Sequence, residues 1–368
     1  MQATDPLRGV RVLDLTRVLA GPLATMMLGD LGADVLKVER PGTGDETRGW
    51  GPPFDERGES AYYLSVNRNK RSLAADLDDP ADQALLRGLT AESDVVVDNF
   101  RPGTLERRGL DPAALLAAHP RLVWCTITGF GSTSERPGYD FVVQAECGWM
   151  AITGEPTGSP MKVGVALADV IAGKDAAVAI LAALLGARRG GADAGGRRIH
   201  ISLAASAAAA LANVAQNALV TGRDAARWGN AHPNLVPYQL FDAQDRPIVV
   251  AVGSDPQWRA CARALELDAL ADDAALATNA GRLAERERVV ATLAERIRDR
   301  PAAAWIERLE RAGVPCGIVK TVLEALRDAD ASPLTGVAPS VPGSVRLRPP
   351  LLDEHGAAVR RLGWGAFG

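Results

Sequence analysis

The sequence predicts an α/β protein, with a Rossmann-like parallel sheet in a large domain and a smaller α+β domain. Three observations lead to this prediction. Short apolar strand patterns alternate with helical stretches over the first half of the chain. The length of 368 residues fits about two domains. The composition, with 47% hydrophobic and 5% aromatic residues, suits small side chains packed tightly between helices and a sheet.

The chain opens with a strand–helix–strand unit. Val10–Leu15 has the pattern of a strand, Gly21-Pro22 starts a helical stretch that ends near Gly32, and Ala33–Glu39 is a second strand. We expect these strands to be parallel, because a helical crossover within one sheet joins parallel strands with a right-handed connection. The first turn lacks GxGxxG, so we predict a Rossmann-like topology without a nicotinamide dinucleotide site.

Similar patterns continue beyond this unit. We expect further strands at residues 93–100, 122–128 and 198–203, and helices at residues 141–150 and 204–220. The helix at 204–220 carries few charges, and we expect it to be buried against protein. The irregular segment 41–63 has the length of a loop that is functional or covers a site.

The composition shifts after Gly222 and predicts the domain boundaries. Residues 225–325 combine strand patterns with charged, alanine-rich helical stretches and are expected to form the small domain. Residues 1–205 and 331–368 are expected to form the large domain, with residues 206–224 as a linker helix region. The Pro/Gly-rich tail is thereby predicted to return to the large domain.

The overall composition argues against several classes of function. The formal net charge is -4, so no basic excess points to nucleic acid. The four cysteines and four histidines are scattered, and their spacing predicts no metal site. No apolar run reaches membrane-spanning length free of charges, and the N-terminus lacks a signal pattern, so we expect a cytoplasmic protein.

Asp169 is the acidic residue with the most unusual surroundings. It follows the mostly apolar run Val163–Ala168 and precedes an alanine-rich helical run. A carboxylate at a helix start accepts hydrogen bonds from free N–H groups, and the helix dipole favours its ionised form. The simple interpretation is a helix cap. The alternative is a carboxylate nucleophile that the helix start keeps charged.

Several separated motifs occur in an order that resembles one family. They are DLTRVLAGP, LGADVLKVERPGTGD, NKRS, NFRPGTLERRGL, ITGFG, GYDFVVQAECGWMAITG and the Asp169 stretch. In this order the chain resembles the family III CoA transferases, which include formyl-CoA, carnitine and succinyl-CoA-dependent dicarboxylate CoA transferases. The α-methylacyl-CoA racemases share their fold. The resemblance extends from about residue 7 to 325 and is strongest over residues 7–205.

The resemblance implies an activity and an assembly. Asp169 would be the nucleophile that carries coenzyme A as an aspartyl thioester between an acyl-CoA donor and a free carboxylic acid. Coenzyme A would then be a substrate, with no tightly bound cofactor. The motif around residues 138–156 is closer to the dicarboxylate enzymes, so we expect succinyl-CoA as the donor. The family fold also implies two interlocked copies of the chain.

The resemblance further implies a set of coenzyme A contacts: Val18 and Ala20 in the first strand-to-helix turn, and Arg40, Arg71, Ala75, Asn99, Phe100, Arg101 and Arg107. Asp78 departs from the family, which often has a lysine at this position. The departure leaves Arg71 or Arg101 to compensate the phosphate charge.

Two other functions remain open at this point. The racemases carry a histidine immediately before the aspartate of the GxD motif, whereas this chain has Tyr139 before Asp140. A neutral tyrosine, with an ordinary pKa near 10, is a poor general base at pH 7. Tyr139 and Asp140 are therefore expected in the substrate pocket, and transfer is favoured over racemisation. A noncatalytic CoA-binding protein is the other alternative, and Asp169 in its full context argues against it.

Overall fold

The computed structural model describes residues 5–189 and 197–368, which divide into two compact units. Unit 1 contains the described residues of Met1–Trp149, Lys162–Arg223 and Ala329–Gly368. Unit 2 contains Met150–Met161 and Asp224–Asp328. The division differs from the expected boundaries in two places: residues 206–223 belong to unit 1 rather than to a linker, and residues 150–161 belong to unit 2.

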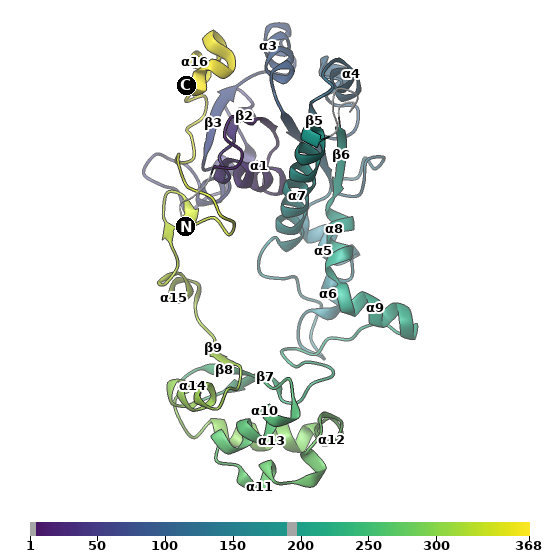
Figure 1. Cartoon of the computed structure of the whole chain (residues 1–368), viewed down its shortest axis with the longest axis vertical. Helices are drawn as coiled ribbons and strands as arrows, with labels where there is room; N and C mark the ends of the chain where they lie inside the picture. Colours follow the sequence, from purple (N-terminus) through teal and green to yellow (C-terminus); the bar gives the residue numbers. More distant parts are fainter. Residues whose placement is uncertain (1–4, 190–196) are drawn as a thin grey trace. The chain divides into compact units, whose positions relative to one another are not determined.

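Unit 1 is built on a six-stranded sheet in the order β3-β2-β1-β4-β5-β6, and all neighbouring strands are parallel (Figure 1). The strands are β1 (Arg11–Leu15), β2 (Asp34–Glu39), β3 (Lys70–Ala74), β4 (Val95–Asp98), β5 (Val123–Thr128) and β6 (Arg197–Ser202). The predicted α/β fold with a parallel sheet is confirmed. The carboxyl ends of these strands share one edge of the sheet, where parallel α/β proteins bind ligands.

Helices cover both faces of this sheet, and the strand sequences divide accordingly. On one face α1 (Ala20–Asp30) and α7 (Leu167–Arg189) pack on a cluster that includes Val12, Val95 and Cys125. On the other face α3 (Pro80–Ala91), α4 (Pro112–Ala118) and α16 (Gly356–Leu362) cover residues such as Leu13 and Trp124. Successive strand residues point to opposite faces, so a sheet covered on both sides needs almost continuous apolar strands.

Two of the predicted helices are each broken in two. Residues 141–150 form α5 (Asp140–Glu146) and the start of α6 (Trp149–Ile152), with Gly148 between them at a φ of 85°. Residues 204–220 form α8 (Leu203–Ala210) and α9 (Ala212–Thr221), whose axes differ by 75°.

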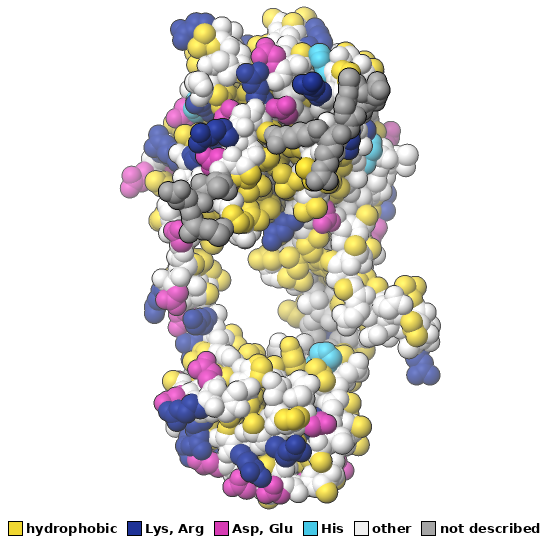
Figure 2. All heavy atoms as spheres, viewed as in Figure 1, with side chains coloured by type: hydrophobic (Ala, Val, Ile, Leu, Met, Phe, Trp, Pro, Cys, Tyr) yellow, Lys and Arg dark blue, Asp and Glu magenta, His cyan; other side chains and the backbone are white. Residues whose placement is uncertain are grey.

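The chain itself does not bury α9, the second part of the stretch that was expected to be packed against protein. None of its residues is buried, and Leu219 and Val220 are 79% and 74% exposed. Figure 2 shows apolar side chains, in yellow, over this helix. Low charge in a helix indicates an apolar environment but does not say whether the same chain provides it.

α7 is the longest helix of the part of the chain that the structure describes. By length and composition alone, Leu167–Ala187 is apolar enough to cross a membrane. One face of the helix, which includes Ala172, Ala176 and Ile180, is buried in the core of unit 1. A core helix passes the same composition test, and packing explains the apolar character of this face.

The remaining elements of unit 1 are short. They are η1 (Glu46–Gly49), α2 (Ala61–Leu64), η2 (Glu106–Arg108), β10 (Ala331–Ser332), β11 (Gly336–Val337) and η4 (Gly363–Phe367). The C-terminal tail packs on the sheet edge near β3. Asn69 donates its backbone N–H to Leu347 O at 2.9 Å, and the Trp364 indole donates to Leu89 O at 3.0 Å.

Unit 2 has an antiparallel sheet in the order β7-β8-β9, which packs with helices around Trp258 and Trp305. Its strands are β7 (Tyr238–Asp242), β8 (Pro247–Ala251) and β9 (Cys316–Ile318). Its helices are α10 (Asp255–Ala264), α11 (Asp268–Ala271), η3 (Ala274–Leu276), α12 (Asn279–Ala284), α13 (Arg286–Ile297), α14 (Ala302–Arg311) and α15 (Val322–Leu326). Unit 2 thus combines an antiparallel sheet with helices.

The packing of the tail predicts a stability effect. Trp364→Ala should lower the free energy of unfolding by about 3–5 kcal/mol, because it removes a large buried aromatic side chain and leaves a cavity. Urea denaturation measures the change. Leu362→Ala, at a side chain that is 51% exposed at the end of the adjoining helix α16, is the control and should stay within about 0.5 kcal/mol of the parent. Equal losses for both variants would contradict this account.

Candidate active site

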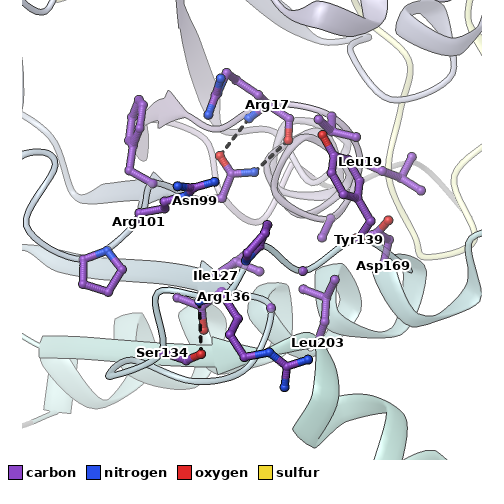
Figure 3. A pocket seen from close by; sticks show the side chains of 18 of the residues that line it. Arg17, Leu19, Asn99, Arg101, Ile127, Ser134, Arg136, Tyr139, Asp169 and Leu203 are labelled. Carbon is purple, nitrogen blue, oxygen red and sulfur yellow. Dashed lines mark hydrogen bonds between the residues drawn. The ribbon is translucent and has the colours of Figure 1, made fainter. Parts of the chain in front are cut away.

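Asp169 lies in the first turn of α7 and lines a cavity of about 230 Å³ at the carboxyl edge of the sheet (Figure 3). The cavity is formed by the turn between β1 and α1, the segment after β4 and the loop after β5. Its lining includes Arg17–Ala20, Asn99–Pro102, Thr128, Gly129, Arg136–Tyr139 and Leu203. Asp169 is thus brought together with residues that are far away in the sequence.

The position of Asp169 depends on the contact between α7 and α1. Gly173 lies one helical turn after Asp169, and a Cβ at Gly173 would lie 2.6 Å from the Ala20 carbonyl oxygen. Such a distance is shorter than any real carbon–oxygen contact, so only glycine permits the two helices to approach this closely. The carboxylate of Asp169 therefore lies beside the first turn of α1, where backbone N–H groups have no partner within the helix.

Asp140 caps the start of α7. Its Oδ1 accepts a hydrogen bond from the Ala168 backbone N–H at 2.8 Å, and its Oδ2 accepts one from Gln144 Nε2 at 2.7 Å. Gln144 Oε1 in turn accepts from the Val163 backbone N–H at 2.8 Å. The capping carboxylate of this helix is thus supplied by α5. Asp140 does not line the cavity, in contrast to the expectation from the sequence.

The helix start does not keep the pKa of Asp169 low. Burial, followed by the negative charge of Asp140, raises the pKa of Asp169 to about 7. Desolvation of the charged form outweighs the favourable helix dipole, whose effect is limited to about 2 kcal/mol in good geometries. Asp169 therefore changes its protonation state much closer to neutral pH than an exposed carboxylate does.

Tyr139 lines the cavity as the sequence predicts. It precedes α5 and is 58% exposed, and Figure 3 shows it on the same side of the cavity as Asp169. The loop that carries it is closed by a backbone contact, because a Cβ on Gly129 would lie 2.4 Å from the Cα of Gly138. This contact brings the loop that follows β5 back to the cavity.

Tyr62 is a neighbour of Asp169 that the sequence did not reveal. Burial, and then the charges of Asp169 and Asp140, raise the pKa of the Tyr62 phenol to about 12. Its ring meets Trp50 edge to face, with ring centroids 5.1 Å apart. Both residues belong to the irregular segment 41–63. Its length predicted a functional loop, but nothing in the sequence singled out these two aromatic residues.

Most of the predicted coenzyme A contacts lie along two cavities that share Arg17, Phe100 and Arg101. Val18, Ala20 and Asn99 line the cavity of Asp169, as do Phe100 and Arg101. Arg40 and Ala75 line a larger cavity of about 580 Å³ over the ends of β1, β2 and β3. The structure therefore places seven of these predicted residues along one edge of the sheet.

Two of the predicted arginines line neither cavity. Arg71 lies in β3, donates to the carbonyls of Ala366 and Phe367 and stacks on the Phe367 ring at 4.2 Å. Arg107 is exposed in η2. Its neighbour Arg108 lines the larger cavity instead and forms two hydrogen bonds to Asp78, at 2.8 and 3.1 Å.

Arg40 and Arg101 differ from the other arginines of these cavities. Among the residues that the structure describes, neither forms an ion pair or a side-chain hydrogen bond, whereas Arg108 pairs with Asp78 and Arg17 pairs with Glu46 at 2.6 Å. Arg17 nevertheless keeps a buried Nε without a hydrogen-bond partner in the described chain. The edge of the sheet thus offers unpaired cationic donors, which suit phosphate and carboxylate groups.

Comparisons with known proteins agree with this geometry. A family model described as CoA-transferase family III matches residues 7–339. The chain is 42% identical over 373 residues to succinyl-CoA:glutarate CoA-transferase of Mus musculus, which covers 95% of this chain and 84% of that protein. It is 44% identical over 336 residues to succinate–glutarate CoA-transferase of Agrobacterium fabrum, with 88% and 82% covered. The crystal structure of a CaiB/BaiF family protein from Brucella suis matches 98% of this chain and 99% of that chain, with a TM-score of 0.87 and 40% identity.

The raised pKa of Asp169 predicts how stability depends on pH. The folded state binds a proton at Asp169 more tightly than the unfolded state does, so ionisation of this group costs stability as the pH rises from about 4 to about 7. Asp169→Asn should therefore raise the free energy of unfolding above pH 7 by roughly 2–4 kcal/mol, and the gain should vanish near pH 4.

Urea denaturation at several pH values measures this difference. Glu287→Gln, at an exposed carboxylate on α13, is the control and should show no comparable gain. An Asp169→Asn variant that is less stable than the parent at pH 8 would contradict the assignment of a buried, destabilising charge.

Proposed function

This chain belongs to CoA-transferase family III and transfers coenzyme A between an acyl-CoA and a carboxylate, and we propose that Asp169 carries the acyl and coenzyme A groups during this transfer. The observation that carries the proposal is the position of Asp169. It is a half-buried carboxylate in a cavity lined by arginines, and no cation is paired with it in the described part of the chain. A carboxylate of this kind keeps free lone pairs for bond formation.

The raised pKa supports a nucleophilic role. With a pKa of about 7, Asp169 is more basic than an exposed carboxylate, and its ionised form is still populated near neutral pH. Nucleophilic strength rises with basicity, provided that the ionised form is populated near the working pH. Entry of substrate also removes water from the carboxylate, which strengthens its interactions within the cavity.

The proposed reaction has four exchanges. An Asp169 oxygen attacks the thioester carbon of the donor, the carbon–sulfur bond breaks and coenzyme A leaves as a thiolate. The thiolate then attacks the side-chain carbonyl carbon of Asp169, which releases the donor acid and leaves an aspartyl-CoA thioester. The acceptor carboxylate attacks the same carbon and displaces the thiolate. Attack of the thiolate on the acceptor acyl carbon then gives the new acyl-CoA and regenerates Asp169.

Each exchange places negative charge on a carbonyl oxygen. The first turn of α1 supports stabilisation of this charge, because Leu19 and Ala20 line the cavity with Asp169. Leu19, the N-cap residue of α1, has no side-chain capping bond. Backbone N–H groups at a helix start are fixed donors in a site from which water is excluded, and loss of one such donor costs about 10²–10³ in rate in a well-studied protease.

We place the nucleotide of coenzyme A in the larger cavity and its thiol end beside Asp169. Arg40 and Arg101 are the unpaired cations near the phosphates in this arrangement, and Ala75, Asn99 and Phe100 line the path. Arg108, held by Asp78, takes the place of the lysine that family members often have at position 78. Among the described residues Asp78 binds only Nε and Nη2 of Arg108, so Nη1 is available for a phosphate.

For the substrates we propose succinyl-CoA as the donor and a dicarboxylic acid such as glutarate as the acceptor. The names of the mouse and Agrobacterium relatives support this choice. The cavity of Asp169 also carries Arg17 and Arg136, and a guanidinium group suits a second carboxylate on the substrate.

We further propose an interlocked homodimer in the cytoplasm. The exposed apolar residues of unit 1 support a dimer. They include Leu219 and Val220 on α9, Val178 and Leu185 on α7, and Phe141 on α5, each at least 52% exposed. Large exposed apolar side chains on several helices of one unit are consistent with a protein–protein interface.

The proposed chemistry predicts the behaviour of Asp169 variants. Asp169→Ala should reduce transfer from succinyl-CoA to glutarate by at least about 10³-fold, because no covalent carrier remains. Mass spectrometry follows the new thioester across a panel of mono- and dicarboxylic acids. In the parent, quenching with succinyl-CoA alone should trap coenzyme A on the peptide that contains Asp169. Glu287→Gln is the control. Undiminished transfer by Asp169→Ala would show that the nucleophile is another group.

The proposed dimer predicts a change of mass. Size-exclusion chromatography with light scattering should give about twice the mass of one chain for the parent. Leu219→Asp should shift the protein toward the monomer, because a buried unpaired charge is costly. Ala118→Asp, at an exposed position of α4, is the control and should remain dimeric. A monomeric parent at micromolar concentration would disprove the proposed assembly.

A further inference from the structure

The backbone turn that follows β1 is held in an unfavourable conformation. Val18 has a φ of 72°, in the left-handed region that β-branched residues rarely adopt. Val18 and the adjoining residues Leu19 and Ala20 line the cavity of Asp169. A strained conformation persists only where surrounding groups impose it, and such positions cluster at functional sites.

Two fully buried side chains, Lys37 and Asp45, hold this turn from both ends. Lys37 Nζ donates to the Thr16 carbonyl oxygen at 2.9 Å and to Asp45 Oδ2 at 2.9 Å. The Asp45 carboxylate accepts the Val18 backbone N–H at 3.2 and 3.3 Å. The ion pair thus connects the carbonyl before Arg17 to the N–H after it.

The backbone groups of residues 16 and 17 have partners of their own. Asp14 Oδ1 accepts the Thr16 backbone N–H at 2.9 Å. Asn99 Oδ1 accepts the Arg17 N–H at 3.1 Å, and Asn99 Nδ2 donates to the Arg17 carbonyl at 2.8 Å, as Figure 3 shows. The contacts of Asp14 and Asn99 fix residues 16 and 17. Only Asp45, supported by Lys37, bonds the N–H of the strained residue itself among the contacts of the described chain.

Stability alone does not account for the ion pair. Burial opposes ionisation of both groups, although each holds its partner charged: the pKa of Lys37 is raised and that of Asp45 is lowered. A buried ion pair often contributes no more to stability than apolar side chains of similar volume would. The ion pair of Lys37 and Asp45 is therefore better explained by the backbone conformation that it imposes.

We infer that Lys37 and Asp45 are positioning residues for the transfer reaction, which impose the left-handed conformation of Val18 and thereby set the backbone of Val18–Ala20 against Asp169 and the bound thioester. The inference rests on the proposed function of this cavity. Neither side chain reacts in it. Loss of the pair should allow Val18 to relax to a favourable φ, which moves the donors at the start of α1.

Glycine at position 18 provides a direct test. Glycine adopts a positive φ without a steric cost. The turn of the Val18→Gly protein therefore depends less on surrounding contacts to keep its conformation. Loss of the ion pair should therefore damage the Val18→Gly protein less than the parent. A purely structural role of the pair predicts equal losses in both backgrounds, because the effects of independent changes multiply.

The experiment is a double-mutant cycle with Asp45→Asn and Val18→Gly. The readouts are kcat and KM for transfer and the Kd of coenzyme A measured by calorimetry. In the parent background Asp45→Asn should lower kcat on the order of 100-fold, the effect of a displacement of about 1 Å, with a smaller change in KM. In the Val18→Gly background the further loss should be less than about 10-fold. Equal fold losses in the two backgrounds would overturn the inference.

Asp30→Asn is a matched control, because Asp30 forms a buried ion pair with Arg68 at 2.7 Å in the same unit, away from the turn. It should alter stability but leave kcat within about threefold of the parent, since it touches no cavity residue. If it lowers kcat as much as Asp45→Asn does, the effect is one of general stability and the inference fails.

Variants that do not fold also decide the question. If Asp45→Asn is insoluble in the parent, Lys37→Met replaces it in the same cycle. Recovery of folded protein in the Val18→Gly background supports the inference, and failure to fold in both backgrounds contradicts it. The calorimetric Kd keeps this test separate from the role of Asp169: coupling between positions 18 and 45 in coenzyme A binding can be present even if Asp169 is not the nucleophile.

Discussion

The close contact between α7 and the first turn of α1 is the constraint on which the cavity depends. Gly173 has no room for a Cβ against the Ala20 carbonyl, and Asp169 lies one turn earlier on the same face of α7. The contact therefore sets how far the carboxylate lies from the turn after β1. A parallel sheet gathers its strand ends at one edge, but it does not itself fix a helix start on that edge to within an ångström. Here the absence of a side chain at Gly173 permits the close contact that fixes the position of the helix start.

The ionisable side chains around this contact differ in whether a group of opposite charge pairs with them. Asp14, Lys37, Asp45 and Lys70 are buried and paired with one another or with backbone groups, and Lys70 and Lys37 hold the pKa of Asp14 at about 2 although burial alone would raise it. Asp169 has no such partner in the described chain, and its pKa rises to about 7. Pairing with a lysine would stabilise Asp169 but would engage its lone pairs and weaken it as a nucleophile. The stability lost at this carboxylate is thus linked to the nucleophilic role that we propose for it.

The sequence predicts local features well and their partners poorly. The alternating strand and helix patterns are sufficient for the parallel sheet, and the position of Asp169 at a helix start follows from the residues around it. The cap of that helix does not, because Asp140 is contributed by another element and its hydrogen bond to Ala168 exists only in the fold. The exposure of α9 was missed for a similar reason, since an apolar helix in a sequence carries no sign of what covers it. Whether the pKa of Asp169 is raised or lowered likewise depends on burial, and the spacing of residues in the sequence does not show burial.

The arginines illustrate why strand ends alone do not identify ligand contacts. Arg71, Arg107 and Arg108 all lie in motifs at or near strand ends, yet only Arg108 lines a cavity. Arg71 is occupied by the C-terminal tail, a segment more than 290 residues away in the chain. Asp78, which removes a positive charge from this edge, also orients Arg108 through two hydrogen bonds. An acidic residue in place of a lysine therefore need not abolish an anion site, because it can supply the guanidinium of a neighbouring arginine in a fixed orientation, a geometry that matches phosphate more closely than an ammonium group does.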